Sequence, residues 1–123
     1  MSHIVEVKTE CRDPAAVAAA CARMRLPPPT QGTARLYEGE ASGLLVKLPG
    51  WLYPAVVDTA SGSVRYDNYG GAWGEPSELG RFLQAYAVAK ATAEAKRRGH
   101  AVAEQALPDG SIRLSIAVGG TLS

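Results

Sequence analysis

The sequence lacks a surplus of either charge. Thirteen Lys and Arg residues face twelve Asp and Glu residues in a chain of 123, which leaves a net charge of +1. This balance gives no global electrostatic reason to bind DNA, RNA or an anionic membrane. Long apolar runs are also missing, so the sequence predicts neither a membrane span nor a signal peptide. We therefore expect a soluble, cytoplasmic protein without a membrane partner.

Cysteine and histidine are scarce. Cys11 and Cys21 form no CxxC motif, and His3 and His100 are not at metal-ligand spacing. A disulfide framework or a zinc site is therefore disfavoured. The acidic residues are scattered, and the sequence predicts no metal and no cofactor. Cys11 precedes a helix start, which can lower a thiol pKa, but a buried and inert thiol is the favoured interpretation.

A catalytic set is also missing. Ser2 becomes an N-terminal nucleophile if Met1 is removed, but Ser2 and His3 point to opposite faces of one predicted strand. Neither histidine neighbours a nucleophile with an obvious third member. The sequence therefore predicts a protein that is not an enzyme and has no catalytic residues.

Several segments carry clear secondary-structure patterns. Residues His3–Glu10 alternate as a half-buried strand does. Asp13 and Pro14 start a helix as N-cap and first helical residue, and the alanine-rich run continues to Arg25. A second helix runs from Pro76 to about Arg98 and carries one apolar stripe in its first half. The other predicted strands are Ala34–Glu40, Gly43–Leu48, Pro54–Thr59, Ser63–Asp67, Val102–Leu107 and Ser111–Val118.

These segments predict an α+β fold in the order β-α-β-β-β-β-α-β-β. Adjacent hairpins favour a mainly antiparallel sheet with two helices packed on one face. The length suits a single domain over residues 1–118, with a frayed tail at 119–123. Beyond Tyr86 the long helix presents mostly alanines, so its last turns either project or are covered by something else.

Residues Tyr66–Gly74 form an aromatic, glycine-rich segment. It has neither the spacing nor the ending of a phosphate-binding loop. One interpretation is a loop that stacks on a ligand, a base or a partner through Tyr66, Asn68, Tyr69 and Trp73. The other is a strand-to-helix connection in which Trp73 closes the core and the glycines allow the bend. We predict that Trp73 is mostly buried and that Tyr69 is exposed; a buried Tyr69 would remove the main support for a contact surface.

Two further groups are candidate sites. Trp51 and Tyr53 share one side of an extended backbone and, with Trp73, could line a small-molecule groove or be ordinary core. Lys90, Lys96, Arg97 and Arg98 make the end of the long helix basic, either as a solvated helix end or as a patch for phosphates or an acidic partner.

Both ends of the chain resemble an uncharacterised family of cyanobacteria, algal plastids and other bacteria, which includes hypothetical chloroplast reading-frame products. The matching residues span almost the whole chain, in the expected order. They are Met1–His3, Lys8–Thr9, Arg12–Asp13, Gln84–Ala87, Gly99, Val102–Gln105 and Asp109–Leu114.

The resemblance implies no catalytic residue and no cofactor. It implies that the chain is encoded near AAA-type ATPases, which favours a non-catalytic subunit. The Tyr66–Gly74 segment departs from the cyanobacterial and plastid pattern, so it is not the shared site of the family. Our first hypothesis is a protein-interaction module, an accessory or adaptor of a multi-protein system, with an AAA-type ATPase as one candidate partner. The alternatives are single-stranded nucleic-acid binding and small-molecule binding.

Overall fold

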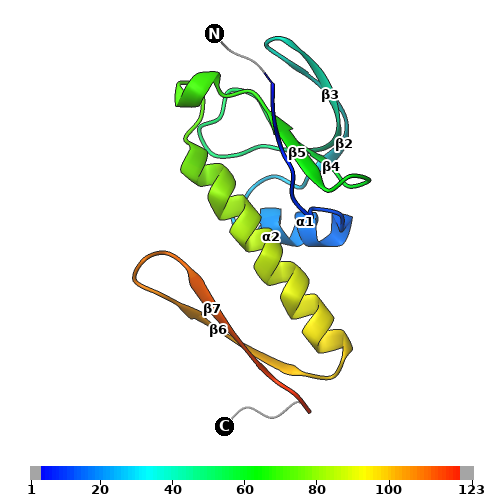
Figure 1. The fold of residues 1–123 in the computed structure, drawn as a ribbon, viewed down its shortest axis with the longest axis vertical. Helices are drawn as coiled ribbons and strands as arrows, with labels where there is room; N and C mark the ends of the chain where they lie inside the picture. The colour runs from blue at the N-terminus through cyan, green and yellow to red at the C-terminus, as the bar shows by residue number, and fades with distance from the viewer. Residues whose placement is uncertain (1–3, 120–123) are drawn as a thin grey trace.

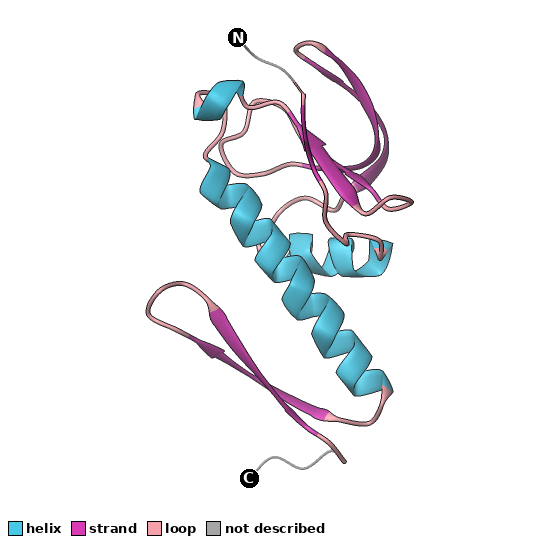
Figure 2. Ribbon diagram, in the orientation of Figure 1, coloured by secondary structure: helices cyan, strands magenta, loops and turns pink. Residues whose placement is uncertain are grey.

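The structure is a computed structural model that describes residues 4–119. It contains two α-helices, a short 3-10 helix and strands in two sheets, and the predicted α+β class is confirmed (Figures 1 and 2). In chain order the elements are β1 (Val5–Val7), α1 (Pro14–Arg23), β2 (Thr30–Leu36), β3 (Gly39–Val46), β4 (Ala55–Asp58), β5 (Ser63–Tyr66), η1 (Tyr69–Gly71), α2 (Pro76–Arg97), β6 (Ala101–Ala106) and β7 (Ile112–Ala117). The predicted residues Ser2 and His3, and nearly all of the predicted tail, lie outside the described residues.

The larger sheet is antiparallel throughout, in the order β1-β5-β4-β3-β2. Both helices lie against one of its faces, and together they close the main core. Val17 of α1, Phe82 of α2 and the sheet residues Val57 and Val64 are all completely buried there. Burying one such side chain contributes about 1.5–3 kcal/mol, so this layer dominates the stability of the fold.

A smaller core lies on the opposite face of the sheet. Leu36 and Val56 are each 1% exposed, although no helix covers them. The β2–β3 hairpin curves in Figure 2, and its residues Ala34 and Ala41 join the same cluster. The curvature therefore supplies the cover that a helix supplies on the other face.

The predicted turn between the second and third strands is wrong. The sequence placed it at Ala41 and Ser42, whereas β2 and β3 are joined through Tyr37 and Glu38. The predicted strand begins at Gly43. Gly43 instead lies inside β3 with φ +156°, where a Cβ atom would be 2.3 Å from the Val57 carbonyl oxygen. Close approach of β4, rather than a turn, requires this glycine.

The β6–β7 hairpin forms a second sheet on the far side of α2 (Figure 1). The last turns of α2, which are rich in alanine, were expected either to project or to be covered by another segment. They are covered, because Val88 and Ala95 are buried although neither belongs to the main core. Helix α2 therefore separates the five-stranded sheet from the hairpin. Its apolar residues face two directions, and its single predicted stripe describes only the first half.

Candidate functional site

The segment between β5 and α2 is held closed by Asn68. Its backbone carbonyl accepts hydrogen bonds from the amides of Gly71 (3.1 Å) and Trp73 (2.9 Å). Its side-chain Nδ2 donates to the Gly74 carbonyl at 3.1 Å. Asn68 is only 6% exposed, so it shapes the loop from within and is not part of a contact surface. Its predicted role in contact is therefore replaced by a structural one.

Tyr69 occupies an unusual backbone conformation. Its φ is +50°, and the next two residues, Gly70 and Gly71, also have positive φ (+61° and +105°). Glycine adopts this region freely, whereas a bulky residue there costs roughly 1–2 kcal/mol. Local folding alone would favour Gly or Asn at position 69. The chain instead places an aromatic ring there, and the ring is 44% exposed.

Three tyrosine rings gather around Trp73. Tyr69 stacks on it with ring centroids 4.7 Å apart and planes 20° apart. Tyr37, from the β2–β3 turn, lies 5.3 Å away at 58°, and Tyr53 lies 5.8 Å away at 68°. Leu52 joins them, because its amide donates to the Trp73 carbonyl at 2.9 Å. We call this set, Tyr37, Leu52, Tyr53, Tyr69 and Trp73, the aromatic patch.

The patch combines exposed and half-buried members. Tyr37 and Leu52 are each 61% exposed, whereas Trp73 and Tyr53 are half-buried beneath their neighbours. The prediction that Tyr69 is exposed and Trp73 mostly buried is therefore confirmed. The contribution of Tyr37 and Leu52 was missed, because they come from loops distant in sequence that only the folded chain brings to Trp73.

Tyr66 and Trp51 lie apart from this patch. Their rings contact each other edge-on, with centroids 5.4 Å apart, and both pack against the main core. Gly74 allows this, because a Cβ atom there would be 2.5 Å from the Trp51 ring. Trp51, Tyr53 and Trp73 therefore do not gather as one group. The backbone turns at Trp51, whose amide donates to the Leu48 carbonyl, so that Trp51 packs against the main core and Tyr53 against the smaller one.

A buried carboxylate contacts the backbone of Tyr69. Asp67 is 1% exposed, and its Oδ1 accepts a hydrogen bond from the Tyr69 amide at 3.4 Å. Among the described residues, its Oδ2 has no hydrogen-bond partner. Buried polar atoms are usually paired, since an unpaired one costs about 1–3 kcal/mol. Sequence reasoning missed Asp67, because it was predicted as the last residue of the strand Ser63–Asp67, whereas β5 ends at Tyr66.

The predicted basic patch lies at the other end of α2. The helix has 22 residues, and at about 1.5 Å per residue it separates this end from Trp73 by roughly 33 Å. Lys90 is not free, because its Nζ contacts Asp13 at 3.1 Å and Glu94 at 3.2 Å. Only Lys96, Arg97 and Arg98 stay exposed as a group. The aromatic and basic residues therefore do not form one continuous surface.

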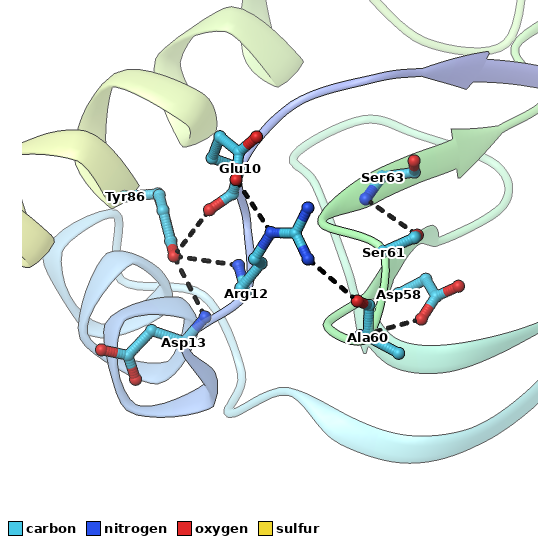
Figure 3. Close-up of polar contacts among 8 residues, drawn as sticks. All are labelled: Glu10, Arg12, Asp13, Asp58, Ala60, Ser61, Ser63 and Tyr86. Atoms are coloured by element: carbon cyan, nitrogen blue, oxygen red, sulfur yellow. Dashed lines mark hydrogen bonds and ion pairs between the residues drawn. The ribbon is translucent and has the colours of Figure 1, made fainter.

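A second polar cluster joins the N-terminal segment to α2 (Figure 3). The Tyr86 hydroxyl accepts hydrogen bonds from the amides of Arg12 and Asp13 and donates to the Glu10 carbonyl, each at 3.1 Å. The Arg12 guanidinium in turn donates to the Ala60 carbonyl in the β4–β5 turn at 3.1 Å. Every group in the cluster is paired, so its chemistry is that of a structural clamp.

The thiol of Cys11 lies next to this clamp. It is 1% exposed, and burial raises its pKa above the ordinary value, which lowers its nucleophilicity. A cavity of about 550 Å³ beside it is lined by Cys11, Tyr86, Lys90 and their neighbours. Another of about 740 Å³ lies between α2 and the β6–β7 hairpin, where Gln84 donates to the Gly110 carbonyl. Neither cavity is lined by the aromatic patch.

Within residues 4–119, no group of three or more His, Cys, Asp or Glu side chains is arranged to hold a metal ion. Neither described helix has the length and apolarity needed to cross a membrane. Comparison with known proteins adds nothing to these observations: no family model, no curated protein and no solved structure matches the chain.

Proposed function

We propose that this chain is a non-catalytic protein-interaction module that binds its partner through the aromatic patch. Tyr69 carries the proposal, because an aromatic residue is held in a backbone conformation that costs energy, and its ring is left exposed. Strained residues persist where the surrounding structure fixes them, and they concentrate at functional sites. Tyr and Trp are also the residues most enriched among interface hot spots.

The extent of the patch supports the same function. Three of its members, Tyr37, Leu52 and Tyr69, are among the most exposed large apolar side chains of the described residues. They lie around one half-buried tryptophan, which matches a hot spot with a supporting rim. We place the chain as an accessory or adaptor subunit. An AAA-type ATPase stays a candidate partner on the family resemblance alone.

The test is affinity purification of the tagged chain from its native host with three versions of the bait. Wild type should recover a stoichiometric protein partner, and Tyr69→Asn should recover much less, because Asn suits a positive φ but removes the ring. Val118→Ser is the matched control, since Val118 is 82% exposed on the distant hairpin. Recovery of no partner, or equal recovery with Tyr69→Asn, would contradict the proposal.

Single-stranded nucleic acid is the second candidate, and one observation favours it. Tyr69 stacks on Trp73, and a flat exposed pair of this kind is the platform on which bases stack. However, Tyr66 is turned toward Trp51, and the basic residues lie at the opposite end of α2. Titration with single-stranded RNA and DNA at low salt separates the candidates, because this mode predicts salt-dependent binding that Tyr69→Asn weakens.

A further inference from the structure

The loops that form the aromatic patch carry charge of one sign only. Residues 37–38, 52–53 and 67–75 contain Glu38, Asp67 and Glu75, and no lysine or arginine. Glu38 and Glu75, which directly follow Tyr37 and Gly74 in the chain, are exposed, whereas Asp67 is buried and contacts the Tyr69 amide. In a chain whose overall charge is nearly balanced, these loops are acidic; the nearby Arg35 of β2 lies opposite Glu40. The loops therefore complement a cation.

The aromatic rings favour the same kind of ligand. A cation above the face of a Trp or Tyr ring is attracted by the quadrupole of the ring. Tyr69 covers one face of Trp73, so a ligand reaches the stacked pair from the outer face of the Tyr69 ring. Tyr37 is tilted against Trp73 nearby. A planar guanidinium stacks on such a surface better than an ammonium does.

We propose that the aromatic patch receives an arginine side chain from the partner protein. The inference rests on the proposed function, and it adds the chemistry that the patch recognises. The guanidinium lies against the Tyr69–Trp73 pair, and Glu38 and Glu75 provide carboxylates at the edge of the patch. The occupant is therefore a basic segment of a protein.

Asp67 favours the cation without touching it. Its Oδ2 is covered and has no partner among the described residues, while its Oδ1 is 3.4 Å from the Tyr69 amide. A buried charge acts through a less polar medium than water and is little screened by salt. Asp67 is thus a positioning residue: it acts through the Tyr69 backbone, next to the residue whose ring the arginine contacts.

The test is an NMR titration of the full chain with N-acetyl-arginine amide and with its neutral near-isostere, N-acetyl-citrulline amide. We expect arginine to shift the Trp73 indole and Tyr69 amide signals with an affinity about threefold to tenfold higher than that of citrulline, as a cation–π contact implies. Equal affinities for the two probes, or shifts confined to other residues, would overturn the inference.

Two isosteric variants separate the role of Asp67 from general electrostatics. Asp67→Asn should remove most of the preference for arginine over citrulline. Glu94→Gln, near the C-terminal end of α2, removes one negative charge at the opposite end of the helix from the patch and should leave the preference intact. If Asp67→Asn keeps the full preference, the carboxylate has no part in recognition.

Failure of this inference is distinguishable from failure of the proposed function. If a partner is captured by the wild type and lost with Tyr69→Asn, while arginine and citrulline bind alike, the patch is an interface but not an arginine site. If Tyr69→Asn leaves capture unchanged, the proposed function itself fails.

Discussion

Two tyrosines of this chain, Tyr86 and Tyr69, differ in exposure and in backbone conformation. Tyr86 lies in a regular helix, is 6% exposed, and has its hydroxyl bonded to three backbone groups of the N-terminal segment. Tyr69 lies in a loop at positive φ and is 44% exposed. The fold fully accounts for Tyr86, whereas at position 69 the stacking on Trp73 is offset by the cost of holding a tyrosine at positive φ. That difference is the reason we propose a contact surface at Tyr69.

Removing the Tyr86 hydroxyl tests the structural side of this comparison. Tyr86→Phe removes three hydrogen bonds and leaves the Asp13 amide without a partner, whereas the Arg12 amide and the Glu10 carbonyl keep the 2.8 Å bond between them. We expect a loss of about 1–3 kcal/mol in the free energy of unfolding, because the partly buried Asp13 amide is left unpaired. Urea denaturation followed by circular dichroism measures it. Tyr69→Phe is the control, and an equal loss in both variants would contradict the contrast.

Gly74 and Gly80 differ in the space available for a side chain, and substitution by alanine tests that difference. A Cβ atom at Gly74 would be 2.5 Å from the Trp51 ring, so Gly74→Ala should cost about 1–3 kcal/mol by forcing that ring to move. At Gly80, inside α2, a Cβ would meet nothing, and Gly80→Ala should stabilise the chain by about 0.5–1 kcal/mol. Thermal unfolding of both variants checks the opposite signs. A stable Gly74→Ala would show that Trp51 is free to shift.

The lowered pKa of Asp13 predicts that the stability of the fold depends on pH. The hydrogen bond from Lys90, followed by the amides of Ala16 and Ala15, holds the Asp13 pKa below its ordinary value of 3.8. A lowered folded-state pKa contributes stability above the unfolded pKa, and that stability is lost as the pH falls through the folded value. The melting temperature should therefore fall more steeply below about pH 4 in wild type than in Asp13→Asn. Parallel curves would contradict this contribution.

Tyr69→Asn should have the smallest effect on stability. Asn tolerates the positive φ, which offsets the lost stacking on Trp73, itself about 0.5–1.5 kcal/mol. We expect the free energy of unfolding to change by less than about 1 kcal/mol, as measured by urea denaturation. A loss similar to that of Tyr86→Phe would mean that Tyr69 serves the fold instead of a partner.

Local sequence patterns predicted the helices and strands well, but they predicted poorly which segments contact one another. Asp13 and Pro14 start α1 as predicted. The strand predicted from the alternating residues after Ser63 is present as β5, which pairs with β4. Gly43 was misinterpreted, because a glycine needed for close approach of two strands looks the same in sequence as one that follows a turn. Within the site, Tyr69 and Trp73 were predicted from composition alone.

The rest of the site depends on tertiary structure. Tyr37 and Tyr53 reach Trp73 only because the β2–β3 hairpin curves and the chain turns after Leu48. The burial of Asp67 follows from its position at the end of β5, beneath the loop, and no sequence spacing predicts an unpaired carboxylate. These features required the folded chain, since they join segments with no local signal of their contact.

The most direct test of the contact surface is the amount of partner that Tyr69→Asn captures relative to wild type, with both proteins shown to be equally folded. We predict that capture falls severalfold or more while the Val118→Ser control stays at the wild-type level. Equal capture by Tyr69→Asn and wild type would contradict the account, and the strained, exposed tyrosine would then have no function at this surface.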